Sequence, residues 1–367
     1  MDPATRSRFS RRALMAQGVF GAVALGMASS GLVRAQDATP VAVDPGQDPL
    51  PSWADGTLKE SILTFVRNSV DPTHPDFVPA SQRIATFDND GTLWCEYPVP
   101  VQAYFSLELA RKMAMSDPES GRAPVFRKAM EPSMNAMATN DPDEYYPIFD
   151  AVNDGLTQQR YIALCREWLE TAKDPETGMR FVDMVYQPQL ELLDLLRASG
   201  YVIFVVSGSA LDFMRAFAPV VYGIPPWQLV GTNYAYGFGE VLGTGQVIAS
   251  PHENVVVVNV DKATGIALHV GLRPIIAVGN SDGDLEMLQY AMGGPTPGLA
   301  MLVHHTDAVR EYAYDRDYRW SPFSKALDLA PKVTKRQCGR RSDGEGAEGE
   351  SKPEGASEHG GRHQMKD

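Results

Sequence analysis

The sequence predicts an α/β fold, a doubly wound parallel sheet with a helical cap domain, over a chain of 367 residues. Apolar runs of strand length alternate with amphipathic helical patterns, which is typical of parallel strands joined by helices. Polar residues follow three of these runs directly, at Asp88, Ser207 and 280–284. Because ligands of such sheets bind beyond the carboxyl ends of the strands, we expect these three places to form one site.

The expected elements follow the period of the apolar residues. Apolar side chains at helical spacing predict a helix over 57–70, and the run at 84–87 predicts a short buried strand. Gly200 closes a predicted helix over 189–200. The remaining predicted elements are helices within 100–172, strand 201–209, helix 210–218, β-like pieces at 229–232 and 255–260, helix 263–271, strand 274–279, helix 284–292 and strand 299–305.

The first 35 residues have the pattern of an export signal. A Ser-Arg-Arg-x-Leu sequence at 10–14 resembles the bacterial twin-arginine signal, and small residues at its end suit cleavage after Ala35. This predicts a periplasmic or secreted protein with no stable membrane anchor after cleavage. An uncleaved anchor over 15–33 is the alternative, although Gly, Ser and Gln dilute that stretch.

The rest of the chain divides by composition into four predicted parts. Residues 36–92 form the first part of the core, 93–198 a helical insert, and 199–332 the second part of the core. The methionine and aromatic stripes within the cap are interpreted as packing. From 333 to 367 the chain is rich in Gly, Glu and Ser and has almost no large apolar residue, so we expect a disordered tail.

Charge excludes two classes of partner. The net charge is −13, and the first 35 residues carry +4, so the remaining chain carries −17. Such a body repels nucleic acid and anionic lipid, and we expect neither as a partner. Chemistry on a phosphate remains possible because a bound divalent metal inverts the local charge. Cys95 and Cys165 could form a disulfide or be two separate core residues; the third cysteine is Cys338.

The stretch Ile84-Ala-Thr-Phe-Asp-Asn-Asp-Gly-Thr92 places two carboxylates beyond a buried strand. In extended chain, Asp88 and Asp90 face the same way. Facing carboxylates repel each other unless a metal neutralises them or one holds a proton. Either solution gives a nucleophile beside an acid that can pass a proton, while Gly91 allows a sharp turn and Thr92 offers a hydroxyl to a phosphate oxygen. An Asx-rich turn is the alternative for this motif taken alone.

Four motifs in a fixed order resemble those of the haloacid dehalogenase superfamily, which consists mostly of phosphatases. Residues 88–92 match its first motif, Asp-x-Asp-Gly-Thr, and Ser207 at a strand end matches the second. Lys262 matches the third, and the acidic loop within 277–288 matches the fourth. The resemblance covers about residues 84–305.

The resemblance implies a role for each matched residue. Asp88 would attack phosphorus and carry a phospho-aspartyl intermediate, and Asp90 would protonate the leaving alcohol and then deprotonate water. Ser207 would hydrogen-bond a phosphoryl oxygen, and Lys262 would neutralise charge. Mg²⁺ would be held by the Asp88 carboxylate, the Asp90 carbonyl and the fourth motif. The second aspartate disfavours dehalogenation, because carbon–halogen-cleaving members generally lack it.

The fourth motif departs from the family pattern, Gly-Asp-x-x-x-Asp. Gly279 and Asp284 fit it, but Asn280 replaces the first acid. An amide oxygen can ligate Mg²⁺ without bringing charge. We favour Asn280 and Asp284 in the metal site and its surroundings, with Asp282 as the alternative ligand.

The resemblance implies that the helical segment 93–198 is a cap that closes over the active site, which favours a small phosphate ester as substrate over a phosphoprotein. Thr92 and Gly208 are expected to contact the substrate, and Trp94 and Glu96, with Tyr97, to contact its leaving group. Ordinary packing is the alternative for Trp94, Glu96 and Tyr97.

The function expected is an exported, Mg²⁺-dependent phosphomonoesterase. A weakened relative that binds a phosphorylated ligand without turnover, motivated by Asn280, and a phosphotransferase are the alternatives, and the oligomeric state cannot be read from the sequence. His304 and His305 are expected to be hydrogen-bonded residues at the sheet end.

Overall fold

The computed structural model describes residues 48–117, 120–130, 134–330 and 337–338. The predicted signal segment and most of the predicted tail lie outside these residues. None of the helices that are described is long and apolar enough to cross a bilayer.

A seven-stranded sheet forms the centre of the molecule, in the order β4-β3-β2-β1-β5-β6-β7. All neighbouring pairs are parallel except β3 and β4, which form an antiparallel hairpin. The strands are β1 (Ile84–Phe87), β2 (Val202–Ala210), β3 (Leu229–Val241), β4 (Thr244–Val255), β5 (Ile276–Gly279), β6 (Leu299–Val303) and β7 (Gln337–Cys338). The doubly wound parallel sheet predicted from the sequence is confirmed.

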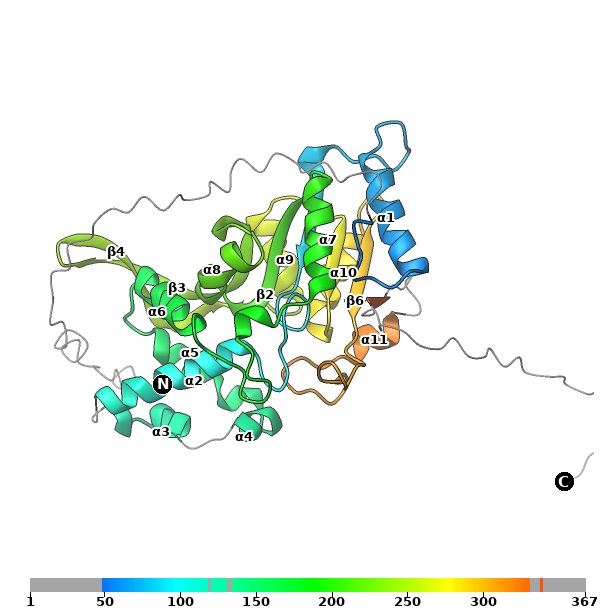
Figure 1. Cartoon of the computed structure of the whole chain (residues 1–367). Helices are drawn as coiled ribbons and strands as arrows, with labels where there is room; N and C mark the ends of the chain where they lie inside the picture. Colours follow the sequence, from blue (N-terminus) through cyan, green and yellow to red (C-terminus); the bar gives the residue numbers. More distant parts are fainter. Residues whose placement is uncertain (1–47, 118–119, 131–133, 331–336, 339–367) are drawn as a thin grey trace, which may run out of the picture.

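Helices cover both faces of this sheet and also form a group beside it (Figure 1). The helices are α1 (Thr57–Val70), α2 (Val101–Ser116), α3 (Pro124–Met130), α4 (Met134–Thr139), α5 (Tyr146–Asn153), α6 (Gln158–Leu169), α7 (Gln187–Ala198), α8 (Leu211–Val221), α9 (Val260–His269), α10 (Leu285–Met292) and α11 (Lys325–Leu329).

Alternate residues of β1 enter two different cores, so the strand is buried on both sides. Ala85 and Phe87 pack into the larger cluster, which includes side chains of α1, α7 and α8. Ile84 packs on the other face with side chains of α9 and α10. A strand covered by helices on both faces reads as an uninterrupted apolar run, which is why the β1 sequence has no alternation.

The helices of the predicted cap fall into two groups. Side chains of α2, α3 and α5 form a core cluster of their own around Phe126, Tyr145 and Ile148. The later helices α6 and α7 contribute instead to the cluster beneath the sheet, through residues such as Cys165 and Leu192. Figure 1 shows α2–α5 gathered beside the sheet, whereas α7 lies along it. The division at 93–198 stays a prediction.

Two local predictions were wrong. The β-like piece expected at 255–260 is instead a hairpin arm that ends at Val255, and residues 256–259 lead into α9. Within the predicted tail, Gln337 and Cys338 pair with β6 as β7. Of the two alternatives left open for Cys95 and Cys165, the structure has the second: they are separate residues and both are free.

Candidate active site

The polar residues of all four sequence motifs meet at the carboxyl ends of the central strands. Asp88 follows β1, Ser207 lies near the end of β2, and Asn280 follows β5. Lys262 enters from the first turn of α9. Because β1 lies between β2 and β5, the order of the strands brings these residues together from distant parts of the chain.

A buried ammonium group joins two carboxylates at the centre of the site. Lys262 Nζ lies 2.5 Å from Asp88 Oδ1 and 2.6 Å from Asp284 Oδ1. Burial raises the pKa of Asp88, the Asp284 charge raises it further, and Lys262 opposes both. Burial alone lowers the pKa of Lys262, but the two carboxylates outweigh it, so its pKa is raised and the lysine stays charged.

Asp284 organises the loop of the fourth motif. Its Oδ2 accepts hydrogen bonds from the backbone N–H groups of Asn280 and Ser281, both at 3.0 Å, and from Ser281 Oγ at 3.1 Å. The side chain also packs against the backbone of Gly279, where an added Cβ would lie 2.4 Å from Asp284 Cγ. Glycine is therefore required there by the close approach of the carboxylate.

Asp90 is fixed by three donors from two segments. Trp94 Nε1 donates to Oδ1 at 2.9 Å, while Ser209 Oγ and Ser207 Oγ donate to Oδ2 at 2.6 and 3.3 Å. Ser207 in turn accepts from the Ser209 backbone N–H at 3.1 Å. Ser209 was missed in the sequence, although its position two residues after Ser207 placed it on the same side of the strand.

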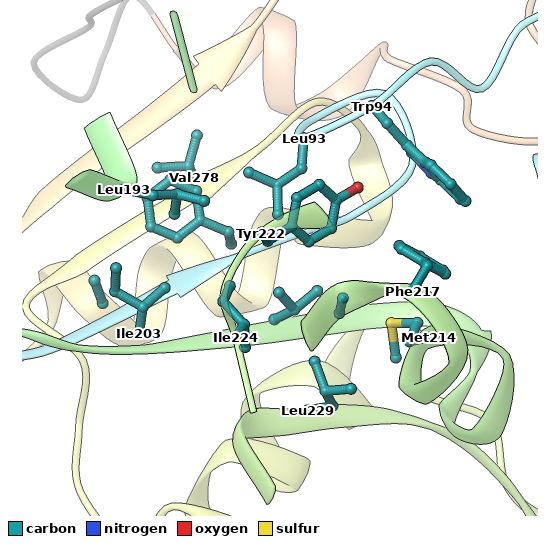
Figure 2. Packing of buried hydrophobic residues seen from close by; sticks show 14 of the residues in the cluster. Leu93, Trp94, Leu193, Ile203, Met214, Phe217, Tyr222, Ile224, Leu229 and Val278 are labelled. Carbon is teal, nitrogen blue, oxygen red and sulfur yellow. The ribbon is translucent and has the colours of Figure 1, made fainter. Parts of the chain in front are cut away.

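Trp94 and Thr92 do not reach the surface of the site, contrary to the prediction that both contact the substrate. Trp94 is fully buried and stacks on Phe217, with ring centroids 4.2 Å apart (Figure 2). Thr92 is also fully buried and donates to Asn280 Oδ1 at 3.3 Å. Both side chains thus position other residues of the site: the tryptophan holds Asp90 and the threonine contacts Asn280.

Glu96 was also predicted to contact the leaving group and is instead enclosed. Asn280 Nδ2 and Tyr314 OH donate to its Oε1 at 2.6 and 3.1 Å, and Ser321 Oγ donates to its Oε2 at 2.7 Å. Burial raises the pKa of Glu96 well above its ordinary value, against the hydrogen bonds from Ser321 and Tyr314. Tyr97, the neighbour in the sequence, stacks with Tyr314.

The turn of the catalytic loop depends on Gly91. Its φ is +71°, and an added Cβ would lie 2.0 Å from Asn280 Nδ2 and 2.4 Å from Glu96 Oε1. The carbonyl of Gly91 accepts a hydrogen bond from His305 Nε2 at 2.7 Å. The sequence suggested only that His305 is hydrogen-bonded at a sheet end; the structure places this buried ring against the catalytic loop.

Asp282, the alternative metal ligand, is committed elsewhere. Its Oδ1 accepts from the backbone N–H groups of Ser324 and Ala326, at 3.0 and 2.9 Å, and so caps the start of α11. Asn280 and Asp284 stay the candidates from this loop, because their side chains contact Glu96 and Lys262 within the site. Gly208, predicted to contact substrate, is exposed beside buried Ser207. A Cβ added to Gly208 would lie 3.1 Å from Val258 Cγ1.

The residues of the site fit a divalent cation. Three buried carboxylates, Asp88, Asp90 and Asp284, share the single charge of Lys262, which leaves excess negative charge. Carboxylate, amide and backbone carbonyl oxygens are the ligands that Mg²⁺ accepts. Within the described residues no three His, Cys, Asp or Glu side chains form a group that could hold a metal. The candidate set differs from such a group because it includes an amide and a backbone carbonyl.

This chain was compared with protein-family models, with curated proteins and with solved structures. The family model for haloacid dehalogenase-like hydrolases matches residues 85–289. A search of the curated proteins found no match.

The solved structures found to be similar to this chain include three bacterial proteins. One of unknown function from Anaerococcus prevotii DSM 20548 is 14% identical, with a TM-score of 0.48 over 76% of this chain and 90% of that one. Another, from Bordetella pertussis Tohama I, is 14% identical, with a TM-score of 0.44 over 70% and 98%. A probable phosphoserine phosphatase from Vibrio cholerae is 17% identical, with a TM-score of 0.34 over 71% and 68%.

The family match extends over more than half of the chain and includes Asp88, Lys262 and Asp284. The protein belongs to the haloacid dehalogenase-like hydrolase family.

Proposed function

We propose that this protein is an Mg²⁺-dependent phosphomonoesterase that acts on a small phosphorylated molecule through an aspartyl-phosphate. The arrangement of Asp88 carries the proposal. Its Oδ1 is held by Lys262, and among the described residues its Oδ2 accepts no hydrogen bond. A carboxylate oriented through one oxygen leaves the other for attack on phosphorus, with Asp90 two residues away.

Four side chains divide the reaction between them. Asp88 attacks phosphorus in line, the ester P–O bond breaks, and Asp90 gives its proton to the departing oxygen. Asp90 then takes a proton from water, which attacks the same phosphorus and releases phosphate and free Asp88. Ser207 donates to a phosphoryl oxygen, and Lys262 neutralises charge beside the nucleophile.

Asp88, Asn280, Asp284 and the carbonyl of Asp90 are the groups that would hold Mg²⁺. When bound, the ion supplies neutralisation of the charge on the transferring phosphoryl group. Since Lys262 already compensates one of the three carboxylates, the remaining negative charge favours a divalent over a monovalent cation.

The test is phosphate release from p-nitrophenyl phosphate, with Mg²⁺ and with EDTA, by the wild type and by Asp88→Asn. We expect metal-dependent release by the wild type and its loss in the variant. Asp194→Asn is the matched control, because it makes the same change in an exposed ion pair on α7. Retained turnover in Asp88→Asn would contradict the nucleophile.

Two outcomes would identify the alternatives. Binding of phosphate without release at any pH from about 5 to 9 would favour a phospho-ligand binding protein, for which Asn280 in place of an acid is the motivating feature. Product formed on an added alcohol in preference to water would identify a phosphotransferase.

We further propose export through the twin-arginine route. The support is the sequence at 10–14, and the test is replacement of Arg11 and Arg12 by Lys. Secretion should stop, and continued efficient secretion would argue against this route.

A further inference from the structure

Glu96 is a buried carboxylate surrounded by donors that come from distant segments. It is 1% exposed, and its two oxygens receive hydrogen bonds from Asn280, Tyr314 and Ser321. Its backbone carbonyl also accepts from Tyr318 OH at 2.9 Å. A charge so enclosed is costly unless its interactions serve stability or function, and the shortest of the three side-chain contacts is with a candidate metal ligand.

The contact with Glu96 determines how the Asn280 amide is oriented. An amide nitrogen is a donor without acceptor capacity, whereas both oxygens of a carboxylate accept. At 2.6 Å from Glu96 Oε1, the Asn280 group must therefore be Nδ2, since an amide oxygen there would be repelled. The amide oxygen is turned to the opposite side, where it accepts from Thr92 Oγ1.

We propose that Glu96 is a positioning residue: by accepting from Asn280 Nδ2 it fixes the side-chain amide so that the amide oxygen is the atom offered to the metal. The inference rests on the proposed function, because it assumes that Asn280 is a ligand of Mg²⁺. It gives the substitution in the fourth motif a physical explanation: an asparagine, unlike the expected aspartate, can donate to Glu96 with one side-chain atom and offer an oxygen to the metal with the other.

The location of Glu96 agrees with this role. It lies in the segment that follows the catalytic loop, and its carboxylate oxygen and the Asn280 amide both pack against Gly91. The two side chains are 184 residues apart in sequence, so the bond also ties the loop after β1 to the loop after β5. A carboxylate hydrogen-bonded to a metal ligand fixes the orientation of that ligand and strengthens it as a donor.

The experiment is calorimetric titration of the full chain, without its signal segment, with MgCl₂, which measures binding without turnover. Glu96→Met keeps the length of the side chain and removes the acceptor of the Asn280 hydrogen bond. We expect its Mg²⁺ affinity to fall by about 10- to 100-fold, the usual effect of losing a partner of a metal ligand. Asp282→Asn is the matched control, since it neutralises an acid in the same loop that caps α11, and we expect less than about a threefold change.

An exchange of donor and acceptor gives the sharpest result. Asn280→Asp alone would place two carboxyl groups in contact, and we expect weaker Mg²⁺ binding and lower stability. In the double variant Glu96→Gln/Asn280→Asp the hydrogen bond runs from residue 96 to residue 280, so the ligand is held again and the affinity should return to near that of the wild type. Should Glu96→Met not fold, Ser321→Ala, which removes a single bond to Glu96, is expected to weaken binding by more than the control does.

Two results would overturn the inference. One is wild-type affinity in Glu96→Met; the other is tighter binding in Asn280→Asp than in the double variant, since both would show that Glu96 does not act on the metal through Asn280. A wild-type protein that binds no Mg²⁺ would instead overturn the metal dependence in the proposed function, and this inference with it.

Discussion

Replacing Trp94 by Phe tests whether this residue orients the proton-transferring carboxylate or contacts the leaving group. The indole N–H donates to Asp90 Oδ1 at 2.9 Å, and the ring stacks on Phe217. A phenyl ring keeps the stack and removes the donor. Asp90 then keeps its two serine donors on Oδ2 but loses the contact that fixes Oδ1.

The expected loss of stability follows from these contacts. A hydrogen bond to a charged group contributes about 1.5–3 kcal/mol, and the smaller buried ring adds about 1–2 kcal/mol. The free energy of unfolding should therefore fall by about 2.5–5 kcal/mol. For a domain of this size that corresponds to a decrease in Tm of roughly 4–9 °C.

Trp168→Phe is the matched control for this substitution. The Trp168 indole also donates to a carboxylate, Glu108 Oε2, at 2.8 Å, and its ring stacks on Phe181, but the hydrogen bond is exposed. We expect it to cost at most about 1 kcal/mol, since water replaces a hydrogen bond that is exposed. Thermal unfolding of the two variants compares the same chemical change inside and outside the site.

Activity separates the two roles of Trp94. Misplacing Asp90 should lower kcat by about 10-fold or more. This is part of the roughly 10²–10⁴-fold rate acceleration that general acid–base catalysis contributes. The factor should be equal for phenyl phosphate and naphthyl phosphate, because Asp90 acts on the ester oxygen that both share. A loss that depends on the size of the leaving group, or a Tm within about 1 °C of the wild type, would refute this reasoning.

Three further predictions concern other contacts of the site and core. Gly91→Ala should abolish activity and lower the denaturant midpoint, because its Cβ would lie 2.0 Å from Asn280 Nδ2. Gly243→Ala is the control: its φ is also positive, but no atom would lie closer than 3.9 Å to its Cβ, so it should lower the free energy of unfolding by only about 1–2 kcal/mol. Equal losses of stability in the two variants would contradict the steric explanation. Lys262→Met leaves two buried carboxylates without their cation, so activity should vanish and the free energy of unfolding should fall by about 3–5 kcal/mol, measured in urea; an unchanged midpoint would show that the ion pairs contribute no stability. Burial raises the pKa of the Cys165 thiol well above its ordinary value, so a thiol reagent at pH 8 should label it in urea and not in the folded protein; rapid native labelling would contradict its placement in the core.

The sheet and the motif residues could be predicted because local chemistry specifies them. The run Ile84–Phe87 reads as buried strand, and Asp88, Ser207 and Lys262 each stand at the end or start of an element. Strand order then brings them together, and the rule that ligands bind beyond the carboxyl ends of parallel strands needs no further information.

The roles of Trp94, Thr92 and Glu96 could not be predicted, because direction and burial depend on segments far away in sequence. Trp94 is enclosed by Phe217 of α8, and Glu96 by donors from 314–321. Proximity to the catalytic loop suggested substrate contact for each of them, whereas tertiary packing turned each one inward. Of β3, only the first residues, 229–232, were predicted as β-like. Glycines such as Gly239 lie in the rest of this strand, and glycine is disfavoured in strand interiors.

The central claim is that Asp88 becomes covalently phosphorylated. The most direct measurement is mass spectrometry of peptides from enzyme quenched in acid during turnover of an aryl phosphate. The account predicts one added phosphoryl group on the peptide that contains Asp88, and none in Asp88→Asn. A phosphoryl group on a different residue, or steady turnover with Asp88 unmodified at every quench time, would contradict it.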